Sequence, residues 1–370
     1  MNSSKTLLIF AYDFPPSSGG ISRLCYEIAT GQLDYFSKIV VLTRKKSGEQ
    51  KPTKQANFKL IELPAKRLKC ELKAIKILMS FDKSSTTILC SLWYPEAFLA
   101  LLSGHKYVYS LAHGAELQSG DSNFRKHFWH GVFAKYILRK VKKVISNSHY
   151  TKNLVLEVSK KSNCNALPLG VDIEQFRPLE KINKSQDFVL GSLSRIHQFK
   201  GYDQVLEALL KLPEVIQQNL TWKIGGTGSY LSTFKEKIIN SAPNFKVEFL
   251  GFIADENLSE YYNHLDVFVL FTQNLSSQNS VEGFGLVFLE AQACGTPVIG
   301  TNTGGIPDAI EHNNGGWLLE QDDVNVLSKQ IEKLYIDKSL LEEQSVFARK
   351  RCVEKSSWEL YNKKIFRILE

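Results

Sequence analysis

The chain has 370 residues, of which 43% are hydrophobic and 23% charged, and its formal net charge is +8. This composition is ordinary for a globular protein and excludes disordered, collagen-like and coiled-coil chains. No uncharged apolar run approaches the roughly 20 residues that cross a bilayer, and the first run, Leu7 to Ala11, is too short for a signal peptide. The six cysteines are scattered without C-x-x-C spacing, which predicts a reduced cytosolic protein rather than a disulfide framework or a zinc site.

Positive charge is concentrated in the first half of the chain. Residues 1–178 carry 27 basic and 13 acidic side chains, a balance of +14, whereas residues 179–370 carry 19 basic and 25 acidic ones, a balance of −6. A split of this size predicts separate partners for the two halves and an anionic partner for the first. Anionic lipid, nucleic acid, a phosphorylated substrate, or a solvated surface without any partner all remain open on this evidence.

Short β-branched runs alternate with longer amphipathic stretches in the first half, as in parallel sheets with crossover helices. The predicted strands are 6–11, 38–43, 58–63, 86–91, 107–112 and 144–147. The predicted helices are 21–33, 95–103, 124–140 and 150–159.

A polar, proline-bounded stretch then separates two α/β domains. After it we predict strands at 188–193, 221–224, 246–250, 267–271 and 298–300 and a helix from Tyr202. The predicted organisation is an N-terminal domain over 1–170, a linker over 171–186, a C-terminal domain over 187–355, and a final helix over 356–370 that can cross back onto the first domain. Two such units in series predict a ligand cleft between them, at the carboxyl ends of the strands.

The richest motif of the second half contains two glutamates eight positions apart, Glu282 and Glu290, around a glycine loop that opens a helix. The backbone N–H groups of a helix N-terminus suit a phosphate, and carboxylates accept well from sugar hydroxyls. We therefore predict a nucleotide-sugar site here; the alternative is a capping glutamate and a solvated one.

Two cations and a glycine loop follow neighbouring strands. Arg195 and Lys200 come directly after the strand at 188–193, where they can neutralise a diphosphate, although any exposed loop can carry two solvated cations. The loop Gly226-Thr227-Gly228 is not the dinucleotide fingerprint G-x-G-x-x-G and lacks a ribose-binding acid at the right offset, so a redox role is disfavoured.

The first half offers three further features. Gly19 and Gly20 precede a helix and can let backbone N–H groups approach an anion, or form a plain turn. His113 follows a strand and precedes a glycine, where it can reach a reacting centre or be purely structural. The basic, aromatic stretch 124–143 can be an interfacial helix with a stripe of Phe124, Phe128, Val132 and Tyr136, or a core-packed helix with a solvated basic face.

These motifs, in their order, resemble the family 4 retaining glycosyltransferases. The resemblance spans nearly the whole chain and comes closest to bacterial mannosyl- and hexosyltransferases that act on lipid-linked acceptors. The residues that carry it are Gly19-Gly20, His113-Gly114, Asn147-Ser148, Pro168-Leu-Gly-Val-Asp172, Arg195 with Lys200-Gly201, Phe249-Leu-Gly-Phe-Ile253, Tyr262, Asp266 and the pair Glu282/Glu290. Two departures are Gly226-Thr227-Gly228, where the family usually has an acid between the glycines, and Leu169, where it commonly has asparagine.

The resemblance implies the GT-B architecture of two facing Rossmann-like domains, α/β with parallel sheets. It also implies a role for each matched residue. Arg195 and Lys200 hold the donor diphosphate, Glu290 takes the ribose hydroxyls, and Gly19-Gly20 close over the phosphates. Glu282 and His113 contact the transferred sugar, and the backbone of Gly283, Phe284, Gly285 and Leu286 completes the donor site.

The predicted function is retaining transfer of a hexose from GDP-mannose or a UDP-hexose to a lipid-linked or glycan acceptor, for a bacterial surface polysaccharide or lipopolysaccharide. No D-x-D motif is present, so no metal or other cofactor is expected. The expected location is the cytoplasm, peripherally at the inner membrane face, with the basic half on anionic lipid. A nucleotide-sugar epimerase of the same fold and a non-catalytic membrane-binding homologue are the alternatives. Nucleic acid is disfavoured because no reading module is recognised.

Overall fold

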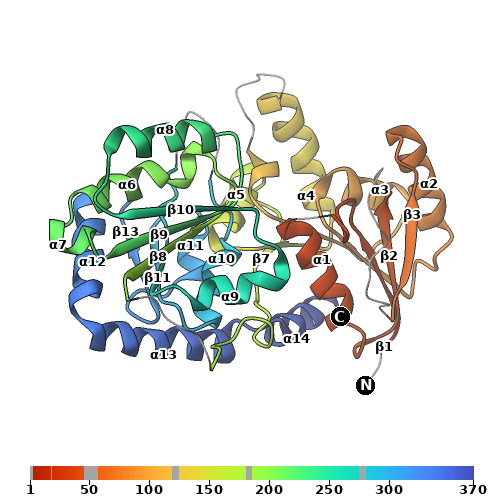
Figure 1. The fold of residues 1–370 in the computed structure, drawn as a ribbon. Coiled ribbons are helices and arrows are strands. Elements are labelled where there is room, and N and C mark those ends of the chain that lie inside the picture. Colours follow the sequence, from red (N-terminus) through yellow and green to blue (C-terminus); the bar gives the residue numbers. More distant parts are fainter. Residues whose placement is uncertain (1–2, 18, 46–56, 119–124, 181–185, 275–280) are drawn as a thin grey trace. The chain divides into compact units, whose positions relative to one another are not determined.

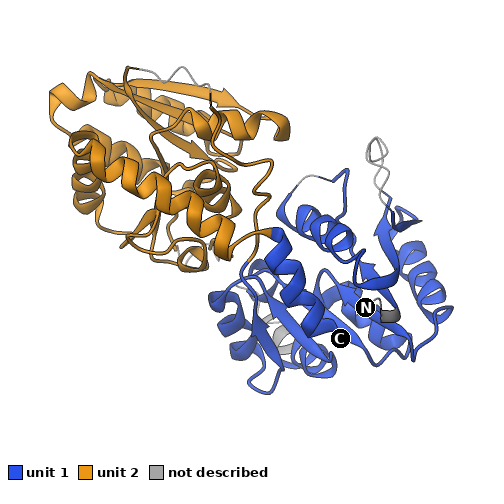
Figure 2. Ribbon diagram, turned by 90° about the horizontal axis from the view of Figure 1, so that it is seen from below, with its two compact units in different colours: residues 1–168, 358–370 blue, residues 169–357 orange. Residues whose placement is uncertain are grey.

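The computed structural model describes residues 3–17, 19–45, 57–118, 125–180, 186–274 and 281–370. The chain divides into two compact units (Figure 2): unit 1 comprises residues 1–168 and 358–370, and unit 2 comprises residues 169–357. The stretch that we predicted as a linker, 171–186, is grouped with unit 2, and the last helix is grouped with unit 1. None of the described helices is both long enough and apolar enough to span a membrane.

Unit 1 is built on a sheet of seven strands in the order β3-β2-β1-β4-β5-β6-β7, with every neighbouring pair parallel. β4 and β5 are buried at every position, as expected for strands covered by helices on both faces. The strands are β1 (Ser3–Phe10), β2 (Phe36–Arg44), β3 (Lys59–Leu63), β4 (Thr86–Cys90), β5 (Val108–Ala112), β6 (Lys143–Ser146) and β7 (Cys164–Ala166).

The helices of unit 1 lie between and around these strands (Figure 1). They are α1 (Gly20–Gly31), α2 (Arg67–Met79), η1 (Trp93–Ala97), α3 (Phe98–Leu102), η2 (Ala115–Leu117), η3 (Arg125–Ala134), α4 (Lys135–Lys140), α5 (His149–Val158) and α14 (Trp358–Leu369). The predicted helix 95–103 is thus one π-helical turn followed by a short α-helix, and the predicted helix 124–140 is η3 followed by α4.

The C-terminal helix α14 packs on α1 through a buried polar contact. Gln32 donates from Nε2 to both the backbone carbonyl and the side-chain oxygen of Asn362, each at 3.0 Å. Gly31 allows this approach, because a Cβ there would lie 2.1 Å from the Asn362 amide nitrogen. Phe366 stacks on Tyr35 with ring centroids 4.6 Å apart. The last residues of the chain therefore complete the fold of unit 1.

Unit 2 has a six-stranded parallel sheet in the order β10-β9-β8-β11-β12-β13. Its strands are β8 (Phe188–Leu193), β9 (Leu220–Gly225), β10 (Lys246–Gly251), β11 (Val267–Leu270), β12 (Val298–Thr301) and β13 (Gly316–Leu319). Its helices are η4 (Gln198–Lys200), α6 (Tyr202–Leu210), α7 (Glu214–Gln217), α8 (Leu231–Ser241), η5 (Asp255–Asn257), α9 (Leu258–Asn263), α10 (Leu286–Ala293), α11 (Ile306–Ala309), α12 (Val324–Ile336) and α13 (Lys338–Lys355).

The sheet order places three loops of unit 2 side by side. Strands β8, β11 and β12 are neighbours and parallel, so the loops that follow them leave from the same end of the sheet. The backbone N–H of Gln273, after β11, donates to the carbonyl of Phe199, after β8, at 2.6 Å. The backbone N–H of Gly305, after β12, donates to the carbonyl of Glu282 at 2.8 Å. The predicted donor-site residues of unit 2 lie on these loops and on the helix α10 that follows the β11 loop.

Candidate functional site

Lys200 and Glu282 form an ion pair at the carboxyl ends of the unit 2 strands. Lys200 Nζ donates to Oε2 of Glu282, and the two side chains are only 11% and 19% exposed. The Lys200 ammonium also lies 5.1 Å from the centroid of the Phe199 ring. Partial burial strengthens such a pair relative to a surface one, because solvent screens it less. The site thus holds one positive and one negative group in contact at the same place.

Glu290 stands on α10, a helix that begins just beyond Glu282. Gly285 precedes the helix with φ +91°, and a Cβ there would lie 2.7 Å from the Phe288 ring, so glycine is needed for this tight entry. Glu290 is 5% exposed and accepts a hydrogen bond from the Tyr262 hydroxyl at 2.8 Å. Burial, together with the charge of Glu290, raises the pKa of Tyr262 well above its ordinary value. The tyrosine therefore stays a hydrogen-bond donor to the glutamate.

Arg195 and His197 also lie on the loop after β8. The Arg195 side chain is exposed. His197 Nδ1 is 3.1 Å from the Ser229 hydroxyl oxygen, and its ring stacks on Phe199. Burial, then the charges of Arg195 and Lys200, lower the pKa of His197, so the ring is neutral near pH 7. The cationic side chains of this loop are therefore Arg195 and Lys200.

The Gly226-Thr227-Gly228 loop has a packing function. Gly226 has φ +110°, and a Cβ there would lie 1.9 Å from the carbonyl oxygen of Ser194. A Cβ on Gly228 would lie 2.2 Å from the carbonyl oxygen of Ile196. The glycines therefore let the loop after β9 press against the loop that carries Arg195, which explains a glycine-rich segment here without any dinucleotide.

In unit 1, His113 follows β5 and is tied to the strand beside it. Its Nε2 lies 2.9 Å from the backbone carbonyl oxygen of Ser91, and its backbone N–H donates to Glu116 Oε1 at 2.7 Å. A carbonyl can only accept, so this contact requires the proton on Nε2 and leaves Nδ1 as the acceptor of the neutral ring. Gly19 and Gly20 lie exposed at the start of α1, with Gly19 at φ +125°.

Within unit 2, the predicted residues Arg195, Lys200, Glu282, Gly283, Phe284, Gly285, Leu286 and Glu290 lie on the segments that follow β8 and β11, and of their side chains Lys200 and Glu282 are in direct contact. The other three, Gly19, Gly20 and His113, follow strands β1 and β5 of unit 1. For the stripe proposed on 124–143, Phe124 and the Phe128 side chain lie outside the described residues, while Val132 and Tyr136 are 59% and 57% exposed.

Two features were not assigned a site role from sequence. Tyr262, the donor to Glu290, is one of many buried aromatic residues and has no local signal that reveals its partner. Gly304 and Gly305, which contact the Glu282 carbonyl, did have a signal: two glycines between a strand and a helix, as at Gly19 and Gly20.

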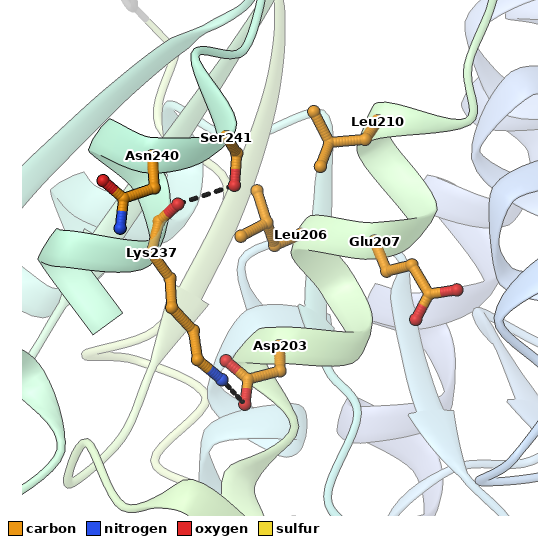
Figure 3. A pocket seen from close by; sticks show the side chains of 7 residues that line it. All are labelled: Asp203, Leu206, Glu207, Leu210, Lys237, Asn240 and Ser241. Carbon is orange, nitrogen blue, oxygen red and sulfur yellow. Dashed lines mark hydrogen bonds and ion pairs between the residues drawn. The ribbon is translucent and has the colours of Figure 1, made fainter. Parts of the chain in front are cut away.

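A surface groove of about 370 Å³ lies elsewhere in unit 2, between α6 and α8 (Figure 3). Its floor carries the ion pair of Asp203 with Lys237, at 2.8 Å. None of the predicted site residues lines this groove.

Comparisons with known proteins agree with this architecture. Residues 172–351 match the family model of the glycosyl transferases group 1. A GDP-mannose-dependent monoacylated alpha-(1-6)-phosphatidylinositol monomannoside mannosyltransferase of Corynebacterium glutamicum is 25% identical over 100% of this chain and 99% of its own. A GDP-mannose-dependent alpha-(1-6)-phosphatidylinositol monomannoside mannosyltransferase of Mycobacterium tuberculosis is 32% identical, but the match covers 46% of each chain, about half the length of that relative.

Solved structures share the fold. Anabaena Alr3699/HepE in complex with UDP and glucose superimposes with a TM-score of 0.80 at 18% identity, covering 99% of both chains. WaaG, a glycosyltransferase involved in lipopolysaccharide biosynthesis, gives a TM-score of 0.70 at 19% identity over 98% of this chain and 99% of its own.

The two parallel-sheet units and these neighbours define the class of the protein as the GT-B fold. Residues 172–351 thus resemble the glycosyl transferases group 1, and these matches support the predicted resemblance to family 4 glycosyltransferases near the bacterial GDP-mannose-dependent mannosyltransferases.

Proposed function

We propose that the protein is a retaining hexosyltransferase that moves a hexose from a nucleoside-diphosphate sugar to a lipid-linked or glycan acceptor. The observation that carries the proposal is the largely buried ion pair of Lys200 and Glu282. It joins the loop after β8, which also carries Arg195, to the segment just before the helix that bears Glu290. Cationic side chains bind a diphosphate, and carboxylates accept hydrogen bonds from the hydroxyls of a sugar or a ribose. Both kinds of group stand here on adjacent loops.

In this proposal the donor is held from its two ends. Arg195 and Lys200 neutralise the diphosphate, and Glu290, oriented by Tyr262, accepts from the ribose hydroxyls. Glu282 accepts from the hydroxyls of the transferred sugar, while the backbone around Gly283, Phe284, Gly285 and Leu286 supplies N–H donors. His113 and Gly19-Gly20 contribute from unit 1. No metal is invoked, since the two cations would supply the positive charge at the diphosphate.

The chemistry proposed is a front-face substitution. The bond between C1 of the sugar and the diphosphate oxygen breaks, and the acceptor hydroxyl oxygen bonds to C1 on the same face. The acceptor proton passes to the departing diphosphate, so the products are the glycoside and the nucleoside diphosphate. The rate gain comes chiefly from cations aimed at the charge that develops on the diphosphate.

Titration calorimetry with GDP, UDP and their common sugar conjugates tests the donor site first. We expect saturable binding of one nucleotide class, weakened by at least about 10-fold in Arg195→Ala, because a guanidinium contact to phosphate is lost. Lys211→Ala is the control. Lys211 lies just past the C-terminal end of α6, where it contacts Glu207 of α6 and Asn325 of α12. Absence of binding by every nucleotide tested would refute the donor site. The named relatives favour GDP-mannose, with UDP-hexoses as the second candidate.

Product analysis separates the rival functions. A transferase releases nucleoside diphosphate only together with a glycosylated acceptor, whereas an epimerase converts one nucleotide sugar into another with no acceptor present. A non-catalytic homologue does neither. The proposed setting is bacterial surface polysaccharide or lipopolysaccharide synthesis in the cytoplasm, at the inner face of the membrane.

An amphipathic helix of unit 1 supports the membrane part of this proposal. Helix α2 exposes Leu68, Leu72 and Met79 to 76%, 68% and 59%, at spacings of four and seven residues that place them on one face. The same helix carries Arg67, Lys69, Lys73 and Lys76, and its opposite face is buried through Cys70, Ala74 and Leu78. An apolar stripe flanked by cations suits the surface of an anionic bilayer.

Sedimentation with anionic phospholipid vesicles tests this surface. We expect the protein to sediment at low salt and to be released as the ionic strength rises, because screening weakens the cationic part of the contact. The double variant Leu68→Ser/Leu72→Ser should lose most of the binding while keeping nucleotide affinity. Ile239→Ser removes an equally exposed apolar residue of unit 2, 74% exposed, and should change nothing. Failure of the unmodified protein to sediment would refute membrane docking.

A further inference from the structure

A carboxyl group that has no role in the proposed donor site lies buried in unit 1. Glu96 stands on η1, directly after β4, and is 1% exposed. A buried carboxylate costs free energy unless hydrogen bonds or a counter-charge compensate it. Among the described residues, none hydrogen-bonds to its Oε2. Packing alone therefore does not explain why a carboxyl group stands at this position.

The other oxygen of Glu96 joins the ends of two strands. Oε1 accepts from the Ser91 hydroxyl, after β4, at 3.0 Å and from the Tyr12 backbone N–H, after β1, at 3.3 Å. The carbonyl oxygen of the same Ser91 contacts Nε2 of His113, after β5, at 2.9 Å. Asn147, after β6, donates from its side-chain amide to the His113 carbonyl at 3.4 Å. One chain of contacts thus links the carboxyl ends of four adjacent strands.

We propose that Glu96 is a positioning residue for His113. Its carboxylate fixes Ser91 through the hydroxyl, and the carbonyl of Ser91 then fixes the His113 ring with its proton on Nε2. Nδ1 is left as a hydrogen-bond acceptor at the end of β5. This inference rests on the proposed function, in which His113 contacts the transferred sugar. Glu96 itself touches no substrate.

In the part of the chain that the structure describes, no cation hydrogen-bonds or ion-pairs with the Glu96 carboxyl. The titratable groups around it are Asp13 and Tyr12 after β1, Cys25 of α1, Cys70 and Glu71 of α2 and Cys90 of β4, with Arg44 of β2 against the Tyr12 ring and His113 beyond Ser91. Burial, with a smaller contribution from Asp13, raises the pKa of Glu96 to about 7 from an ordinary 4.5.

The direction of the Glu96 pKa shift indicates that the ionised carboxylate does not serve to stabilise the fold. The folded chain binds the Glu96 proton more tightly than the unfolded chain, so the group stabilises the fold below its unfolded pKa. That stability is lost as the pH rises from about 4.5 through about 7. The ionised form, which is the better double acceptor for Ser91 and Tyr12, is thus kept at a cost to stability.

Two substitutions at Glu96 test the inference by steady-state transfer kinetics. Glu96→Ala should lower kcat about 10- to 100-fold, with the donor KM changing less than about 3-fold, because a misplaced group slows the reaction more than it weakens binding. Glu96→Gln keeps an acceptor for Ser91 and should stay within about 5-fold of the unmodified protein at pH 8. In the unmodified protein, kcat should fall by no more than about 5-fold as the pH drops below about 7, because protonation weakens the acceptor, and Glu96→Gln should show no such fall since that residue cannot titrate.

Matched measurements keep the test decisive. Glu71→Ala, which removes an exposed ion pair with Arg67 in the same unit, should leave kcat unchanged. When the pH is raised from 5 to 8, the thermal stability of the unmodified protein should fall more than that of Glu96→Gln, because only the native carboxyl loses a proton over this range. An unchanged kcat in folded Glu96→Ala overturns the inference, and so does an unaltered pH profile in Glu96→Gln.

Imidazole ¹⁵N NMR of His113, assigned with His113→Asn, separates this inference from the proposed function. If no pair of donor and acceptor yields transfer, the proposed function fails. The His113 resonance would still show whether Glu96 orients the His113 ring. A Glu96→Ala variant whose His113 loses the fixed Nε2–H tautomer supports the positioning role. An unshifted resonance overturns it.

Discussion

Glu282→Ala should lower kcat for sugar transfer by about 10³-fold while the protein stays folded, because in the proposed function the carboxylate contacts the transferred sugar and its loss would affect the transition state directly. The side chain is 19% exposed and its main interaction is the ion pair with Lys200, so truncation opens no cavity in the core. Steady-state kinetics with the donor identified by calorimetry, together with circular dichroism and thermal unfolding, measures both parts of the expectation.

Two companion variants define what Glu282 contributes. Glu282→Gln keeps the size and one acceptor and should recover only part of the activity, since the charge that pairs with Lys200 is lost. Glu248→Ala removes a glutamate that is ion-paired with Lys246 on β10, at 2.5 Å, and should leave turnover unchanged. Turnover of Glu282→Ala within about 5-fold of the unmodified protein would remove this residue from the site.

Glu290→Ala should weaken nucleotide binding by about 10- to 100-fold, because hydrogen bonds to a charged group contribute about 1.5–3 kcal/mol. Tyr262→Phe should weaken it by less, about 3- to 10-fold, because the ring remains and only the hydroxyl that orients Glu290 is lost. Calorimetric affinities for the nucleoside diphosphate and for the nucleoside alone measure both effects. The loss should persist with the nucleoside, since the proposed function places Glu290 on the ribose and not on the phosphates.

The neighbouring tyrosine is the matched control for Tyr262. Tyr261 is equally buried in the same helix, but its hydroxyl donates to the backbone carbonyls of Ser192 and Lys223, at 3.0 and 3.1 Å. Tyr261→Phe should lower stability without changing nucleotide affinity. Equal losses of affinity in the two tyrosine variants would show that Tyr262 acts only through folding.

Regular elements with a clear pattern were predicted close to their observed bounds. The first strand was expected at 6–11 and is Ser3–Phe10, and the amphipathic stretch from Trp358 to Leu369 is the helix α14. Elements with weak patterns were missed. Helix α2 mixes cations with exposed leucines, and only Cys70, Ala74 and Leu78 mark its buried face. Strands β7 and β13 have three and four residues, too few for a period to show, and the sheet edges beside them hold them in place.

The sequence by itself determined the α/β class, the approximate domains and the residues placed at the strand ends, because alternating patterns and the spacing of Glu282 and Glu290 are local properties of the chain. Only the tertiary structure decided which of those residues meet. Lys200 and Glu282 are 82 positions apart, and Tyr262 and Glu290 are 28 apart. The first contact arises because β8 and β11 are neighbours in the sheet while other strands separate them along the chain, and the second because α9 packs on α10. The role inferred for Glu96 also depends on tertiary structure, since adjacent strand ends place Tyr12 and Ser91 against its carboxylate and His113 against Ser91.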